Sequence, residues 1–273
     1  MGRPLPGRTF ALVIGGGPAG GFTALELAQQ GCDVVLLESQ SKPGWKIGET
    51  LAPEARIHLQ RLRIWNDFVA QGHLPCHGIV SVWGSETPLA KDFIFNPHGH
   101  GWQLDRSRFE SALLRAAAAA GCEIYFNTSL TNLVRHNGQW CADTTAGMIQ
   151  AEWIFDGTGR RAAVAAQFAG AYKQYDDLVS VFVLAESPLA TDADSRTYVE
   201  ALPHGWCYTA LIPNGQRVVT FQTDRSLMCG APTAEWFWGQ LSLESPIRKL
   251  LIQHEYQFVG TPQIAAAHTG RFE

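Results

Sequence analysis

The chain has 273 residues, of which 46% are hydrophobic and 17% charged, and its formal net charge at pH 7 is −4. This length can bury a core for one large domain or two closely joined ones, and the absence of any Lys/Arg-rich run argues against nucleic acid as a partner. No apolar stretch is long enough to cross a bilayer, and the first residues lack the apolar segment and cleavage site of a signal peptide. We therefore expect a cytoplasmic protein with no membrane partner.

The first predicted elements form a strand–helix–strand unit. Residues 10–14 (FALVI) are a short apolar run that ends in a glycine-rich turn. A helix is expected over 18–30, where Gly31 stops it, and the β-branched run 33–37 (DVVLL) predicts a second strand that ends at Glu38.

The turn between these elements, GGGPAG, satisfies the dinucleotide-binding pattern GxGxxG through Gly15, Gly17 and Gly20. Such a turn lets the backbone approach a pyrophosphate at the start of a helix, and Glu38 stands where an acid would accept hydrogen bonds from the adenosine ribose. The pattern alone does not separate FAD from NAD. The expected cofactor-binding residues of this turn are Gly15, Gly17, Pro18, Ala19 and Gly20.

The remaining elements are taken in chain order. Helices are predicted over 53–65, 105–120, 233–243 and 246–253, and strands over 79–83, 122–126, 178–185, 197–202, 206–212 and 217–223. The stretch 130–155 is predicted to form several short strands with a turn at 136–138. The first predicted helix, 53–65, offers Ile57, Leu59, Leu62 and Ile64 for burial.

Cysteine and histidine are the residue types that could act as metal ligands or nucleophiles in this chain. The six cysteines are scattered without a CxxC pair, at positions Cys32, Cys76, Cys122, Cys141, Cys207 and Cys229. The stretch GHLPCHG places His73, Cys76 and His77 close together, and a second loop holds His98 and His100, but neither spacing matches a zinc site. We expect no metal and no disulfide framework, with most cysteines acting as small buried hydrophobic residues.

Two further segments resemble FAD-dependent monooxygenases of the p-hydroxybenzoate hydroxylase type. The first is IFDGTGR (154–160), a strand that ends in a glycine turn with Asp156 at its tip. The second is LDRSRFESALL, in which Arg106 leads a helix. The resemblance implies that Asp156 and Arg106 lie near FAD. It also implies an α/β fold with a Rossmann-like FAD-binding domain and a second, mostly antiparallel β-sheet domain for substrate.

Other motifs narrow the resemblance to the flavin-dependent tryptophan halogenases and their monooxygenase relatives. GWKIGETLAP (44–53) is similar to their KIGExLxP segment, which implies that Lys46 lies at the cofactor. HGWCYTALIP (204–213) is similar to their GWxWxIP signature, with Trp206 kept and Tyr208 in place of the second tryptophan. The resemblance covers essentially the whole chain.

The halogenases of this family carry a lysine shortly before a strand that ends in Trp-Gly. Counting back from Trp83-Gly84, that position falls at Cys76 or His77, and the chain has no lysine between Lys46 and Lys91. The resemblance therefore implies hydroxylation of an indole or phenol ring through a flavin C4a-hydroperoxide, with O2 as co-substrate. His73 or His77 is the candidate base, and the candidate catalytic residues are His77, Trp206 and Tyr208.

Several alternatives stay open. The Tyr208 motif and the missing lysine resemble the flavoproteins that mature peptidyl-tryptophan quinone cofactors, which makes a tryptophan in a partner protein a candidate substrate. A halogenase, a geranylgeranyl-reductase-like flavoprotein and a catalytically silent flavin-binding protein are the alternatives. With one GxGxxG unit, electrons can come from NAD(P)H directly or as reduced flavin from a partner reductase.

The predicted FAD-binding domain is discontinuous, over 1–75 and 101–175, and the predicted substrate domain covers 76–100 and 176–273. Relatives continue with a strand bearing a Gly-Asp motif that touches the flavin, whereas this chain stops at Glu273. We therefore expect the C-terminal part of the family fold to be missing, FAD to bind weakly and turnover to be slow.

Overall fold

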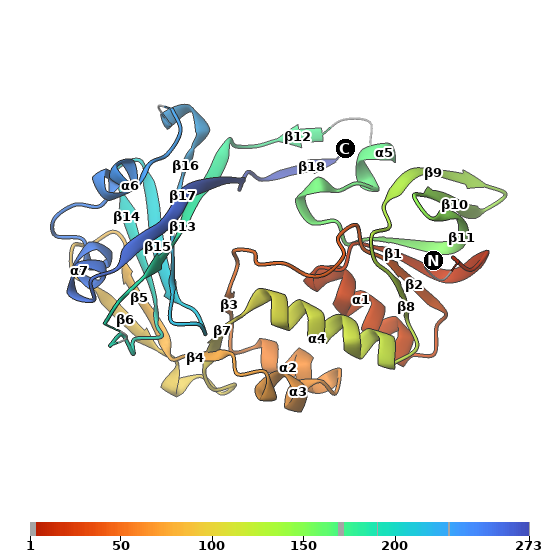
Figure 1. The fold of residues 1–273 in the computed structure, drawn as a ribbon, viewed down its shortest axis with the longest axis horizontal. Coiled ribbons are helices and arrows are strands. Elements are labelled where there is room, and N and C mark those ends of the chain that lie inside the picture. The colour runs from red at the N-terminus through yellow and green to blue at the C-terminus, as the bar shows by residue number, and fades with distance from the viewer. Residues whose placement is uncertain (1–3, 169–171, 190, 229, 273) are drawn as a thin grey trace.

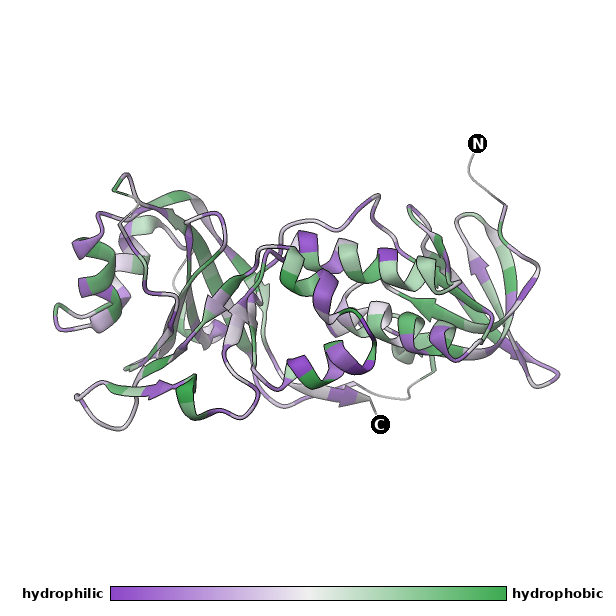
Figure 2. Ribbon diagram, turned by 90° about the horizontal axis from the view of Figure 1, so that it is seen from below, coloured by the Kyte–Doolittle hydropathy of each residue, from purple (hydrophilic) through white to green (hydrophobic). Residues whose placement is uncertain are grey.

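The computed structural model describes residues 4–168, 172–189, 191–228 and 230–272. Its strands fall mainly into two sheets that lie at opposite ends of an elongated molecule (Figures 1 and 2). The predicted fold class is confirmed: a Rossmann-like α/β sheet is joined to a second, mostly antiparallel sheet. No helix among the described residues is long and apolar enough to cross a membrane.

The first sheet has the strand order β8-β2-β1-β11-β10-β9. Its strands are β1 (Arg8–Ile14), β2 (Val34–Leu37), β8 (Glu123–Tyr125), β9 (Leu130–His136), β10 (Gln139–Thr144) and β11 (Gly147–Asp156). The pairs β8–β2, β2–β1 and β1–β11 are parallel, whereas β9, β10 and β11 form an antiparallel meander. The predicted turn at 136–138 is confirmed, with Asn137 and Gly138 both at positive φ, as a two-residue hairpin turn requires.

Helices α1 (Pro18–Gln29) and α4 (Arg106–Ala119) cover one face of this sheet. Val34 and Leu36 point from β2 into the same core as Leu25 of α1 and Leu113 of α4. The side chain of Asp105 accepts a hydrogen bond from the Arg108 amide and so caps α4, which starts where the sequence predicts. These two helices hold the glycine turn and Arg106 at the same end of the sheet.

The prediction of a single helix over 53–65 is wrong. The chain forms α2 (Ala55–Arg61) and α3 (Trp65–Ala70), and Arg63 between them adopts a positive φ of 57° that interrupts the helix. The break lets Leu59, Leu62 and Ile64 all be buried, but Ile57 stays exposed. A small sheet, of order β3-β7-β4, follows nearby, with strands β3 (Thr50–Leu51), β4 (Leu74–Cys76) and β7 (Gly101–Gln103).

The second large sheet has the order β17-β13-β16-β15-β14-β5-β6, and all its pairs are antiparallel except β14–β5. Its strands are β5 (Gly78–Val82), β6 (Leu89–Asp92), β13 (Leu178–Glu186), β14 (Thr197–Leu202), β15 (Gly205–Leu211), β16 (Arg217–Asp224) and β17 (Gln257–Ala266). The strand β17 was not predicted. The division of the chain into domains stays a prediction.

Helices α6 (Ala234–Gln240) and α7 (Pro246–Gln253) pack on one face of this sheet, around Cys207 and Phe221. Because side chains alternate along a strand, Trp206 and Tyr208 point to the other face. The remaining elements are short: α5 (Ala165–Phe168), β12 (Tyr172–Gln174), β18 (Gly270–Phe272), and the 3₁₀ turns Phe93–Phe95, Gly159–Arg161 and Arg225–Leu227.

Candidate FAD-binding site

Three glycines bring the turn after β1 against the turn after β11. A Cβ on Gly20 would lie 1.9 Å from the carbonyl oxygen of Gly15, and a Cβ on Gly15 would lie 2.6 Å from the carbonyl oxygen of Gly157. Gly15 also has a φ of +99°, which disfavours any other residue. The predicted roles of Gly15 and Gly20 in a tight turn and a close helix–strand contact match this geometry.

Gly17 differs from its neighbours because a Cβ added there would meet no atom within 4 Å. It is the N-cap of α1 and has no side chain to bond the first amides of the helix. The start of α1 therefore presents unpaired N–H groups toward open space. A cavity of about 370 Å³ occupies that space.

Most of the predicted cofactor residues line this one cavity. Among its lining residues are Gly15, Gly17, Pro18, Ala19, Glu38, Lys46 and Arg106, together with Glu110, the stretch Thr128–Leu130 and the turn Gly157–Gly159. Gly20 and Asp156 are not among them. Gly20 acts from beneath, by letting α1 approach the turn.

Glu38 is fixed by the backbone around the cavity. Its Oε2 accepts a hydrogen bond of 2.7 Å from the amide of Gly16, and its Oε1 accepts one of 2.8 Å from the amide of Gln40. Oε1 also accepts a hydrogen bond of 3.3 Å from the Ser39 hydroxyl, so Oε2 is the oxygen that can accept a further bond. The carboxylate is thus held at the end of β2 with capacity left for a ribose hydroxyl.

Lys46 and Arg106 converge on Glu110, whose side chain is only 1% exposed. Lys46 Nζ lies 3.0 Å from Glu110 Oε2, and Arg106 forms an ion pair with the other carboxylate oxygen. Arg106 also donates to the carbonyl oxygens of Ile47 and Gly48, at 3.0 and 2.9 Å. Its buried Nε has no hydrogen-bond partner, which leaves one donor for a ligand.

Asp156 organises the turn rather than facing the cavity. Its carboxylate accepts hydrogen bonds from the amide and hydroxyl of Thr158 and from the amides of Val164 and Ala165. Burial would raise the pKa of Asp156, but these bonds outweigh it and lower the pKa. The structure thus gives Asp156 a role in shaping the Gly157–Gly159 wall of the cavity.

These residues fit FAD. A backbone open at Gly17, free amides at the helix start and a carboxylate at the second strand are the groups that bind a dinucleotide, and the Nε of Arg106 lacks a partner beside them. Gly15, Gly17, Glu38, Lys46 and Arg106 are the residues that would hold FAD at this cavity.

The loop that carries Lys46 also touches the second sheet. The ring centroid of Trp45 lies 5.9 Å from that of Phe182, and Glu49 interacts with Tyr208. Glu49 is 2% exposed, its Oε1 has no hydrogen-bond partner, and burial raises its pKa. Burial, followed by the neighbouring Glu49 charge, raises the pKa of Tyr208 as well.

The three predicted catalytic residues are not brought together. Trp206 and Tyr208 share the open face of the second sheet, where the ring centroid of Trp206 lies 6.2 Å from that of Trp83. His77 instead lines a separate surface cavity of about 410 Å³, with its ring centroid 5.5 Å from that of His100. Its catalytic role stays a prediction.

His73 and Cys76 lie inside the protein. His73 packs on Phe68, its Nδ1 accepts a hydrogen bond from the Asp105 amide, and burial followed by the charge of Arg108 lowers its pKa to about 4. Cys76 is fully buried and donates to the carbonyl oxygen of Gly78. No group of three or more His, Cys, Asp or Glu side chains that could hold a metal ion occurs among the described residues, and Cys229 lies outside them.

Residues 8–230 match the family described as FAD binding domain. The chain belongs to this family. Among curated relatives of this FAD-binding chain, sulochrin halogenase gedL of Aspergillus terreus is 25% identical over 88% of the chain and 50% of its own length. The chain spans between about a third and a half of the length of the relatives that it matches.

Solved structures of flavin enzymes share the fold. The flavin-dependent brominase Bmp2 superposes on 97% of this FAD-binding chain with a TM-score of 0.83 at 20% identity, and the chain covers 69% of it. The p-nitrophenol 4-monooxygenase PnpA of Pseudomonas putida DLL-E4 superposes on 97% with a TM-score of 0.75 at 17% identity, and the chain again covers 69%.

Some residues of the FAD-binding site were missed from the sequence. Glu110 is four residues after Arg106 on a predicted helix, so the spacing could have shown that the two share a face. Thr128, Ser129 and Leu130 gave no signal, because only the folding of the loop after β8 brings them to the cavity.

Proposed function

We propose that this chain forms the FAD-binding and substrate-facing part of a flavin-dependent monooxygenase that hydroxylates an electron-rich aromatic ring, an indole or a phenol. One observation carries the proposal. The resemblance places the halogenase lysine at Cys76, a buried thiol, or at His77, and no lysine stands between Lys46 and Lys91. The ammonium group that would handle an oxidised halide is therefore missing.

The arrangement around loop 45–50 supports ring hydroxylation. Lys46 lines the cofactor cavity, while Trp45 next to it contacts the sheet face that carries Trp206 and Tyr208. An aromatic substrate on this sheet face would contact apolar rings that help to exclude water. With its pKa raised, Tyr208 keeps its proton at neutral pH and can donate a hydrogen bond to a phenol or carbonyl oxygen.

Reduced FAD, when bound, supplies the two electrons that activate O2, so that one oxygen atom of O2 is transferred to the ring and the other leaves as water. The chain's own residues hold the cofactor at Gly15–Gly20, fix Glu38 for its ribose and orient the substrate ring. Electrons come from NAD(P)H or from the reduced flavin of a partner reductase, and a reduction assay with each donor distinguishes the two.

A halogenase is the second candidate, because the named curated relative gedL is a sulochrin halogenase. PnpA, whose structure shares the fold, is a monooxygenase. The finer prediction, hydroxylation of a tryptophan within a partner protein, rests on the Trp206–Tyr208 motif and the missing lysine and stays a prediction.

The test is a turnover assay of the FAD-loaded protein with a flavin reductase and a panel of phenols, indoles and tryptophan-containing peptides. In ¹⁸O2 and without halide, the proposal expects a product heavier by one labelled oxygen, a shift of about 18 Da for oxygen transfer by a flavin. Product that forms only with chloride or bromide and carries the halogen would contradict hydroxylation and favour the halogenase.

A further inference from the structure

One buried amide side chain joins the small β3-β7-β4 sheet to the second large sheet. Gln103 of β7 is 0% exposed, and its Oε1 accepts a hydrogen bond of 2.8 Å from the Thr50 hydroxyl. Its Nε2 donates to Thr197 Oγ1 at 2.9 Å and to the carbonyl oxygen of Ser195 at 3.5 Å. A carbonyl oxygen can only accept, so the contact with Ser195 keeps the NH2 group of the amide on the β14 side. Gln103 is thus bonded to β3 through one end and to β14 through the other.

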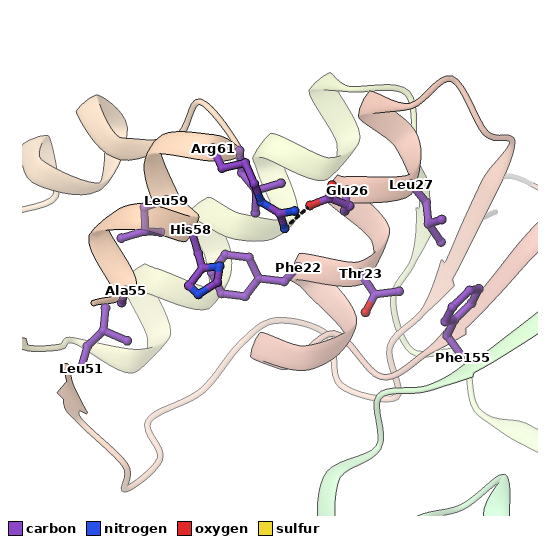
Figure 3. Close-up of a pocket in the computed structure, with 11 residues that line it drawn as sticks. Phe22, Thr23, Glu26, Leu27, Leu51, Ala55, His58, Leu59, Arg61 and Phe155 are labelled. Carbon is purple, nitrogen blue, oxygen red and sulfur yellow. Dashed lines mark hydrogen bonds and ion pairs between the residues drawn. The ribbon is translucent and has the colours of Figure 1, made fainter. Parts of the chain in front are cut away.

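Thr50 belongs to a segment that is already fixed to the FAD-binding part of the molecule. Lys46 lines the FAD cavity, and Arg106 donates hydrogen bonds to the carbonyl oxygens of residues 47 and 48. On the other side of Thr50, Leu51 lines an apolar groove of about 570 Å³ beside α1 and α2 (Figure 3). The position of Thr50 is therefore determined by the same elements that shape the cofactor cavity.

Thr197 belongs to the strand that borders Tyr208. In the pairing of β14 with β15, Val199 lies opposite Tyr208, and Thr197 stands two residues earlier on β14. Residues two apart on a strand point to the same face, so Thr197 shares the sheet face of Tyr208. The bond from Gln103 to Thr197 therefore reaches the face on which the substrate ring is proposed to lie.

Another contact between loop 45–50 and the second sheet has less directional character. The ring centroids of Trp45 and Phe182 lie 5.9 Å apart, and Trp45 is 45% exposed. Dispersion between rings changes gradually with distance and permits small shifts. Breaking the bonds of Gln103 would instead leave buried polar groups without partners, which is costly. Gln103 therefore defines the separation of the two parts more sharply than the ring contact does.

We propose that Gln103 is a positioning residue that sets the separation between the FAD cavity and the substrate face of the second sheet. It does not line the FAD cavity and acts through Thr50 and Thr197. The inference rests on the proposed function, because it names what aligns the substrate ring with the cofactor. A misplacement of about 1 Å between reacting groups costs about a hundredfold in rate. O2 that takes two electrons from reduced FAD and two protons, without transferring oxygen to a ring, leaves as hydrogen peroxide.

The first test compares two substitutions of Thr197 in the FAD-loaded protein. Thr197→Val keeps the shape of the side chain but removes the hydroxyl, whereas Thr197→Ser keeps the hydroxyl. The matched control is Thr9→Val, which removes another buried hydroxyl, bonded to the Asp33 carbonyl oxygen at 2.9 Å in the first sheet. Reduced protein is mixed with O2 and an aromatic substrate, and hydroxylated product and hydrogen peroxide are measured per O2 consumed. We expect Thr197→Val to lower the product yield about tenfold in favour of peroxide, and Thr197→Ser and Thr9→Val to keep the parent yield.

The second test uses amide hydrogen exchange of the FAD-free protein, so it needs no turnover. Gln103→Met breaks both bonds at similar side-chain length, and Thr197→Val breaks one of them. We expect both variants to speed exchange across residues 47–51 by about tenfold or more, relative to residues 8–14 of β1, which report global unfolding. A loss of stability alone would speed exchange in both segments together. If Gln103→Met does not fold, Thr197→Val decides the result.

The proposal is overturned if Thr197→Val keeps the parent yield of product per O2, or if Thr197→Ser does not restore that yield. It is also overturned if exchange across residues 47–51 changes only in step with residues 8–14. If the parent forms no hydroxylated product from any substrate, the proposed function fails, and the exchange comparison alone decides the role of Gln103. Faster exchange confined to residues 47–51 then supports the proposal, and unchanged exchange there contradicts it.

Discussion

The Cα of Gly20 lies 2.9 Å from the position that a Cβ on Gly157 would take. This contact joins the start of α1 to the turn after β11, so two segments more than a hundred residues apart build one wall of the cofactor cavity. Both glycine turns can be predicted from the sequence. Only the fold shows that they pack against each other so closely that neither Gly20 nor Gly157 has room for a side chain.

Replacing Gly157 with Ala should destabilise the protein. The new methyl group would also meet the Gly20 nitrogen and the Ile14 carbonyl oxygen at 3.0 Å, and rigid backbone on all sides cannot yield cheaply. Overpacking of this kind costs about 1–3 kcal/mol. Urea unfolding should show a lower midpoint at an unchanged slope, whereas Gly7→Ala, where a Cβ meets nothing within 4 Å, should unfold like the parent. Equal midpoints would contradict the contact.

Lys46 and Arg106 both pair with the Glu110 carboxylate, but replacing each of them should affect stability and FAD affinity differently. Arg106→Leu leaves the buried Glu110 with a half-exposed lysine alone, and breaking such a buried pair costs about 3 kcal/mol. Lys46→Met removes a partner that is 49% exposed, so stability should change by less than about 1 kcal/mol while FAD affinity falls. Thermal unfolding and flavin titration of both variants check this. Equal stability losses would refute the assigned roles.

Asp194 should make stability depend on acid pH. Burial would raise its pKa, but hydrogen bonds from Arg196 and Tyr198 outweigh it and lower the pKa from 3.8 to about 2. A lowered carboxyl pKa contributes stability above pH 4, and this is lost as pH falls from about 4 to 2; it amounts to about 2 kcal/mol. The stability gap between parent and Asp194→Asn should therefore shrink over that range in denaturant titrations. A constant gap would argue against the shift.

The local elements were largely predictable because their causes are local. GGGPAG lies between an apolar run and a predicted helix. The stretch 130–155, with its turn at 136–138, predicts the short strands that the structure arranges as a meander. The break at Arg63 was not predictable, because burial of both Leu62 and Ile64 decides it rather than helix propensity. Strand β17 was not predicted because seven of its ten residues are exposed and its partner β13 is far away in the sequence.

The site was predictable where backbone chemistry dictates it and less so elsewhere. The turn Gly15–Gly20 and Glu38 line the cavity as their spacing indicates, apart from Gly20, which acts from beneath. Asp156 was proposed from the IFDGTGR motif, and the structure places its carboxylate within the turn, away from the cavity. His77 was proposed from its place near the expected lysine position, and it lines a different cavity. Residue type alone does not reveal which side of a turn a side chain takes.

Gly17→Ala tests the central claim, that FAD binds along the two glycine turns. The parent chain, Gly17→Ala and the control Gly7→Ala should be titrated with FAD, by flavin fluorescence, beside melting curves of each. A methyl group at Gly17 touches nothing in the protein but enters the cavity, so we expect an unchanged melting temperature and a Kd raised about tenfold or more, with Gly7→Ala unaffected in both. If the Gly17→Ala variant binds FAD as tightly as the parent, the cofactor does not lie where the account places it.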